Sequence, residues 1–115
     1  MQKNNFLGNI GLCARAKQCV SGEENCLNAI RGDRVSFLLM EKNVSSNTEK
    51  RFRNACSFRK IPLLVYEREK WDVPNAVGRS KCKLIAILKG SWAKPLYEQA
   101  LQFDIAILIQ GGIYE

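Results

Sequence analysis

The sequence predicts a layered α/β fold in a single domain. Segments with the periodicity of amphipathic helices alternate along the chain with short apolar runs that are typical of buried strands. A length of 115 residues suits one domain with one sizeable core. The composition is 46% hydrophobic and 25% charged, which is ordinary for a globular protein and argues against disorder.

The first elements are indicated by apolar spacing. Phe6, Ile10 and Cys13 recur at intervals of four and three, which predicts one buried helix face. The chain then runs extended for a few residues near Cys19. The apolar run from Val35 to Met40 is typical of a strand that is covered on both faces.

Two capping boxes predict where the second and third helices begin. Ser21 and Glu24 have the spacing of an N-cap residue and its partner, and Ser46 and Glu49 repeat it. Gly32 falls where a left-handed residue often ends a helix.

The second half continues the alternation. We expect a strand over Leu63 to Tyr66, a short helix that is capped by Asp72 and closed by Gly78, and a central strand over Leu84 to Leu88. Ser91 opens a last helix with apolar residues at roughly helical spacing, namely Trp92, Leu96, Ala100 and Phe103.

The end of the chain fits no single interpretation. We assign residues 1–103 to the domain and residues 104–115 to a C-terminal tail. The apolar run from Ile105 to Ile109 is compatible with an edge strand and with an extension of the last helix.

Residue types that usually carry catalysis or bind metals are scarce. The chain has no histidine, and its five cysteines include no C-x-x-C pair, so we expect no metal site, no cofactor and no enzyme activity. Free buried thiols suit a reducing cytoplasm. No apolar run is long enough for a signal peptide or a membrane span, so we expect a cytoplasmic protein without membrane contact.

The charge balance favours a polyanionic partner. Lys and Arg number 18 and Asp and Glu number 11, a net charge of +7. The basic residues gather in segments 15–18, 42–43 and 79–83, at predicted ends of helices or strands, where side chains can converge on phosphates. Glu24, Asn25 and Asn43 are candidates for contacts with base edges.

The order of several motifs resembles that of the YlxQ-like proteins of the ribosomal L-seven-A-e superfamily. The resemblance spans roughly residues 6–100. It is carried by Gly11 to Ala16, Val20 to Glu24, Leu38-Leu39, Asn43 to Ser45, Asn47-Thr48, Ile61 to Leu63, Ala76 to Arg79 and Trp92 to Lys94.

This resemblance implies a three-layer α/β/α sandwich with a central mixed sheet of about four strands. It also implies a protein that binds kink-turns or related structured RNA. We expect a monomer, with ribosomal RNA, a small RNA or the ribosome itself as the partner. Three loops would converge on the RNA, over residues 22–28, 42–45 and 77–81. The candidate RNA-binding residues are Lys17, Gln18, Gly22, Glu23, Glu24, Asn25, Asn28, Lys42, Asn43, Val44, Val77, Gly78, Arg79, Ser80 and Lys81.

The chain departs from the kink-turn pattern G-x-N-E-x-x-K. Glu24, Asn25 and Asn28 stand where that pattern has Asn, Glu and Lys. A lost cation and an added carboxylate weaken attraction to phosphate, which motivates an alternative, a protein-interaction adaptor that uses the same basic face. Lys17 also replaces a family glycine, at a cost of roughly 1 kcal/mol if that position needs a positive φ. A thiol-dependent enzyme is a third and weaker hypothesis, since no base accompanies the cysteines.

Overall fold

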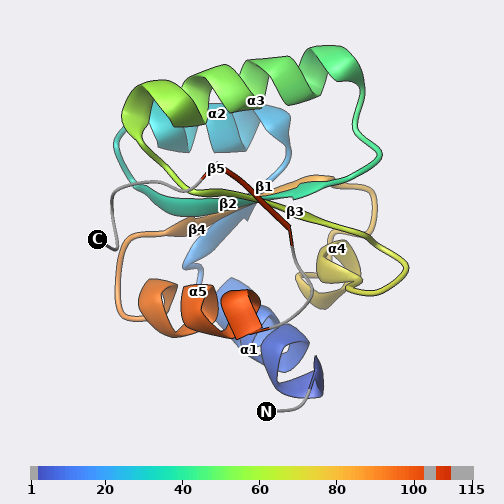
Figure 1. Cartoon of the computed structure of the whole chain (residues 1–115). Helices are drawn as coiled ribbons and strands as arrows, with labels where there is room; N and C mark the ends of the chain where they lie inside the picture. Colours follow the sequence, from blue (N-terminus) through green and yellow to red (C-terminus); the bar gives the residue numbers. More distant parts are fainter. Residues whose placement is uncertain (1–2, 103–105, 110–115) are drawn as a thin grey trace.

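The computed structural model describes residues 3–102 and 106–109. Two helices cover one face of a central sheet and three helices cover the other face (Figure 1). The three-layer sandwich is therefore confirmed. The first pair is α2 (Glu23–Arg31) and α3 (Ser46–Arg59), and the second set is α1 (Lys3–Arg15), α4 (Val73–Ala76) and α5 (Ala93–Gln102).

The sheet is mixed, as expected, with the strand order β1-β4-β2-β3-β5. Strands β2 and β3 are parallel, and the other neighbours are antiparallel. The sheet has five strands where about four were expected, because Ala106–Ile109 pairs with β3 as an outer strand. The strands are β1 (Cys19–Ser21), β2 (Val35–Glu41), β3 (Leu63–Tyr66), β4 (Leu84–Leu88) and β5 (Ala106–Ile109).

Both faces of the sheet are packed, so the central strands are apolar almost throughout; Ser36 and Glu41 are the polar residues of β2. All seven residues of β2 are buried, which confirms the strand predicted from a run that is apolar almost throughout. On the α1 and α5 side, the Phe37 and Tyr97 rings meet edge to face at 5.3 Å. On the other side, α3 buries Phe52 and Cys56. The predicted apolar position at Phe103 lies outside the described residues.

Both predicted capping boxes are wrong by one residue. Ser21 does not cap α2, because it belongs to β1 and pairs with Ile85; the N-cap is Gly22, which has no side-chain cap. In α3 the N-cap is Ser45, whose Oγ accepts a hydrogen bond from the Thr48 amide at 3.1 Å. Ser46 is the first residue inside that helix.

Helix ends were predicted with mixed success. Gly32 has φ −83°, and the left-handed residue after α2 is Asp33, with φ 57°. Asp72 caps α4 as predicted, and Gly78 follows it with φ 76°. Lys17 has φ 60°, so the position of the family glycine does require a left-handed backbone. Helix α5 begins two residues after Ser91, at Ala93.

No helix in the described part of the chain is long and apolar enough to cross a membrane.

Candidate nucleic-acid interface

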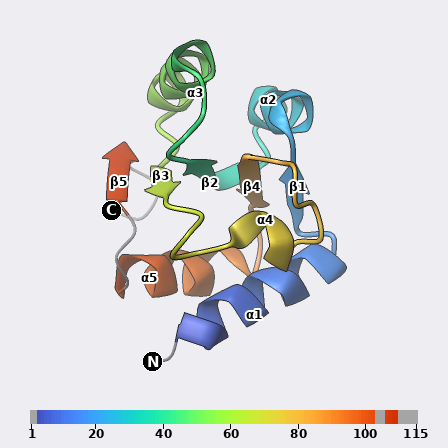
Figure 2. The same cartoon turned by 90° about the vertical axis from the view of Figure 1, so that its right-hand side faces the viewer.

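The loops that follow β1 and β2 meet the loop that precedes β4 at one edge of the sheet. They meet there because β1 and β2 both run antiparallel to β4. The carboxyl ends of β1 and β2 therefore lie beside the amino end of β4. The Gly22 amide donates to the Leu84 carbonyl, and the Glu41 amide donates to the Lys83 carbonyl, each at 2.9 Å. Figure 2 faces this edge, with α4 in front and with α2 and α3 seen nearly along their axes.

A cleft of about 610 Å³ opens at this edge, between the end of α1, the outer strand β1, the start of α2 and the loop after α4. Four of the predicted residues line it, namely Lys17, Asn25, Val77 and Arg79. The cleft is completed by Ala14, Cys19, Val20, Ser21 and Cys82. A smaller hollow of about 210 Å³, lined in part by Arg15 and Gly78, shares Ala14 and Val77 with the cleft.

The cleft carries unpaired positive charge. Lys17 and Arg79 of the cleft, and Arg15 of the adjoining hollow, are exposed, and none of them forms an ion pair with another residue that the structure describes. The loop that bears Arg79 is compact, because the Arg79 amide donates to the Pro74 carbonyl and the Cys82 amide donates to the Arg79 carbonyl, both at 2.9 Å. The cleft therefore presents cations on a shaped surface to an anionic ligand.

The loop after β2 is tied to the same edge. Lys83 Nζ donates to the Asn43 carbonyl at 3.4 Å, and Tyr66 Oη donates to the Lys83 carbonyl at 3.3 Å. Val44 is half-buried and packs against the core beneath α2 and α3. Lys42 and the Asn43 side chain remain exposed, so this loop adds a cation and an amide beside the loop after α4.

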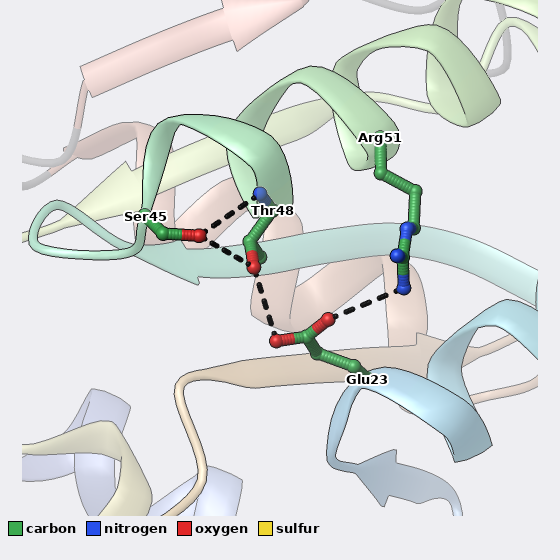
Figure 3. A network of polar contacts seen from close by, with 4 residues as sticks. All are labelled: Glu23, Ser45, Thr48 and Arg51. Atoms are coloured by element: carbon green, nitrogen blue, oxygen red, sulfur yellow. Dashed lines mark hydrogen bonds and ion pairs between the residues drawn. The ribbon is translucent and has the colours of Figure 1, made fainter.

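Glu23 faces α3 (Figure 3). Its Oε2 accepts a hydrogen bond from Thr48 Oγ1 at 3.1 Å, and its Oε1 lies 3.5 Å from Arg51 Nη1. Thr48 Oγ1 in turn accepts a hydrogen bond from Ser45 Oγ at 3.0 Å. This network joins the first residue of α2 to the start of α3, and it sets the position of the loop that precedes α3.

Gln18, unlike Asn25, does not line the cleft. The Gln18 carbonyl accepts from the Leu88 amide at 2.9 Å, which places Gln18 at the far end of β1. Asn25 Nδ2 donates to the Ser21 carbonyl at 3.1 Å across the turn into α2. The remaining members of the set, Glu24, Asn28, Ser80 and Lys81, are exposed on α2 or on the loop after α4.

Two thiols in the cleft were missed by sequence reasoning. Cys19 is half-buried in the cleft wall, and the Cys13 thiol donates a hydrogen bond to it, which lowers the pKa of Cys19 and raises the pKa of Cys13. Cys82 also lines the cleft. By contrast, burial raises the pKa of Cys26 and of Cys56 to about 12. No sequence signal shows the contact between Cys13 and Cys19, because it depends on the turn between α1 and β1.

No group of three or more potential metal ligands occurs within residues 3–102 and 106–109.

Comparison with curated proteins adds a relationship by sequence. RNA-binding protein YlxQ of Bacillus subtilis strain 168 is 29% identical over 87 residues, which cover 76% of this chain and 86% of that protein. RNA-binding protein YlxQ of Enterococcus faecium is 26% identical over 89 residues, which cover 77% and 84%. The resemblance to the YlxQ-like proteins is confirmed. No family model matches the chain.

Solved structures are similar to this chain in fold. A protein of unknown function from Bacillus halodurans matches with a TM-score of 0.72 and 24% identity, over 81% of this chain and 93% of that one. The Giardia lamblia 15.5kD RNA binding protein matches with a TM-score of 0.66 and 12% identity, over 84% and 81%. At these identities the matches show a shared fold alone.

Proposed function

We propose that this chain binds structured RNA at the edge of the sheet where the three loops meet, and that it performs no chemistry there. The observation that carries the proposal is the cleft with its adjoining hollow: Lys17 and Arg79 line the cleft, Arg15 lines the hollow, and all three are exposed and unpaired among the described residues. Unpaired cations around a shaped cleft suit a phosphate backbone. The two curated relatives are named as RNA-binding proteins.

Each group of candidate residues has a distinct proposed role. Lys17, Arg79 and Lys81, together with Lys42 on the neighbouring loop, contact phosphates. Asn25 and Asn43 supply amides for base edges. Gly22 and Gly78 provide backbone with positive φ, which lets the RNA approach the main chain closely. The other candidates, Gln18, Glu23, Glu24, Asn28, Val44, Val77 and Ser80, shape or flank these loops.

The start of α2 contributes a further attraction for phosphate. Helix α2 begins at the cleft edge, and its N-cap Gly22 offers no side chain to the free backbone N–H groups of the first turn. Such groups and the helix dipole attract anions. Glu24 in the same turn opposes this attraction, so we expect an RNA other than the standard kink-turn to be bound.

We further propose that the ligand is ribosomal RNA or a small RNA, and that residues 1–103 bind it as a monomer in the cytoplasm. The five free thiols suit a reducing compartment. Crosslinking in cells, followed by sequencing of the bound RNA, would identify the ligand. Partners that persist after nuclease treatment would favour the adaptor alternative instead.

The direct test is the salt dependence of binding to the RNA identified in this way. If four cations each neutralise one phosphate, the slope of log K against log salt is about −3 to −4. Arg79→Ala should weaken binding to all sequences and reduce the slope by about 1. Lys94→Ala, an exposed lysine on α5, is the matched control and should change neither. A binding constant that is independent of salt would contradict the proposal.

A further inference from the structure

A row of four exposed side chains follows the outer side of α3. Asn47, Arg51, Asn54 and Phe58 succeed one another at spacings of four, three and four residues, which places them on one side of an α-helix. All four are exposed, and Phe58 has an exposed fraction of 83%. The row is separate from the buried face of α3, where Phe52 and Cys56 meet the core.

The surroundings of Phe58 are strongly basic. Residues 46–60 contain five cations and one carboxylate, so their net charge is 5 − 1 = +4, out of +7 for the whole chain. One exposed aromatic ring is ordinary on a protein surface. An exposed ring among cations and amides has the composition of a surface that binds single-stranded nucleic acid.

Four of these five cations remain available to a ligand, and Lys60, at the C-cap of α3, is one of them, since it is exposed and in no ion pair with a described residue. Arg53 is engaged by Glu49, at 2.8 Å. Arg51 is oriented by Glu23 at 3.5 Å, yet its side chain is still 58% exposed. Lys50 and Arg59 are exposed and form no ion pair with any residue in the described ranges.

We propose that this outer row of α3 is a second RNA-contact surface, continuous with the cleft edge. In it the Phe58 ring stacks on an unpaired base, the amides of Asn47 and Asn54 bond to base edges or sugars, and Arg51 contacts a flanking phosphate. The inference rests on the RNA-binding function proposed above. It adds a chemical class of target, which is a single-stranded segment next to the structured element.

The position of the row supports this continuity. Helix α3 starts at the loop after β2, which lies on the cleft edge, and it runs away from that edge across the sheet (Figure 1). Phe58 lies 11 residues beyond Asn47, so at 1.5 Å per residue the row is about 16 Å long. A strand that leaves the cleft past Asn43 can follow this row.

A protein partner fits the row less well. Stable protein interfaces bury a contiguous patch with an apolar centre. The other large apolar side chains that are exposed among the described residues, Leu12 and Leu101, lie on α1 and α5, in the opposite layer. Among the residues whose burial is described, Phe58 therefore has no exposed large apolar neighbour with which to form such a patch, and the cations around it favour a polyanion.

The test compares Phe58 variants on one RNA. The probe is a hairpin with single-stranded flanks, selected on the wild-type full chain from a randomised pool, and its affinity is measured by fluorescence anisotropy. Phe58→Ala and Phe58→Leu should each weaken binding about tenfold, because both remove base stacking. Phe58→Trp should bind at least as tightly as wild type. Leu12→Ala is the control for loss of an exposed apolar side chain, and it should bind like wild type.

A second measurement locates the contact directly. With 5-iodouridine in the flanks, photocrosslinks should appear on the peptide that contains Phe58, in addition to peptides from the cleft. Crosslinks confined to the cleft peptides would overturn the inference.

The outcomes separate the two proposals. If Phe58→Ala and Phe58→Leu bind like wild type while Arg79→Ala is weakened, the cleft is the RNA site and the inference about α3 is wrong. If the selection on wild type enriches no RNA, the proposed function fails and the inference fails with it. If Phe58→Ala instead lowers the mass in solution without changing RNA affinity, Phe58 is a contact between copies, and the inference is again overturned.

Discussion

Lys17 combines a backbone cost with a charged position in the cleft. It adopts φ 60° in the turn after α1, where its amide donates to the Ala14 carbonyl and the Gln18 amide donates to the Cys13 carbonyl, both at 3.0 Å. A left-handed backbone costs a residue with a side chain about 1 kcal/mol. The same side chain lines the cleft. Fold stability therefore favours glycine at this position, whereas attraction of an anionic ligand favours a cation.

Replacing Lys17 should separate these two effects. Lys17→Gly relieves the left-handed strain, and we expect the free energy of unfolding to rise by about 0.5 to 1 kcal/mol, which is seen as a higher midpoint in thermal denaturation. RNA affinity should fall because a cation is lost from the cleft. Lys17→Met, the matched control, also loses the charge but keeps the strain, so it should weaken binding without stabilising the fold. Equal stability of the two variants would show that the backbone at this position stores no strain.

At the scale of the element, local patterns predicted the type of each helix and strand better than its ends. The segment 45–49 offers two similar caps, Ser45 with Thr48 and Ser46 with Glu49. The true start of α3 depends on the turn that leaves β2, which no local pattern records. Ser21 was misassigned for a related reason, since β1 pairs with β4, more than 60 residues away in the chain.

The start of α3 gives a sharp test of this correction. Ser45→Ala removes the oxygen that accepts from the Thr48 amide, so the free energy of unfolding should fall by about 1 kcal/mol. Ser46→Ala is the matched control: the residue is exposed and lies inside the helix, where Ala is the better helix former. It should be neutral or slightly stabilising in urea denaturation. If Ser46→Ala were destabilising and Ser45→Ala were neutral, Ser46 would be the N-cap, as was predicted from the sequence.

The candidate site shows the same limit of local reading. Basic segments at element ends could be found in the sequence, and Arg79 and Lys17 do line one cleft. The two thiols of the cleft wall and the orientation of Glu23 toward α3 could not be found, because each depends on contacts between segments far apart in the chain. Sequence identifies which side chains can bind a polyanion, and topology decides which of them meet.

At the scale of the whole molecule, the positive charge is unevenly placed. The loops of the cleft edge and the segment 46–60, which contains α3, hold much of it, and they adjoin at the start of α3. A net charge of +7 alone would attract RNA to any face, mainly by speeding association. Grouped cations on fixed loops also slow dissociation, because each stays opposite its phosphate.

A comparison of two double variants should distinguish the effect of the net charge of the molecule from the effect of cations at fixed positions on the cleft edge. Arg34→Glu with Lys94→Glu lowers the net charge by two units at each position, from +7 to +3, at exposed residues away from the cleft. Arg79→Ala with Lys81→Ala lowers it only to +5. If the cations on the cleft edge control binding, the second variant should bind RNA roughly tenfold or more weakly, and its slope of log K against log salt should be smaller by about 2. The first should lose about threefold or less, mostly in the association rate. A larger loss of RNA affinity in the first variant would mean that RNA is attracted by the net charge of the whole molecule, and it would contradict the proposal that the cleft is the binding site.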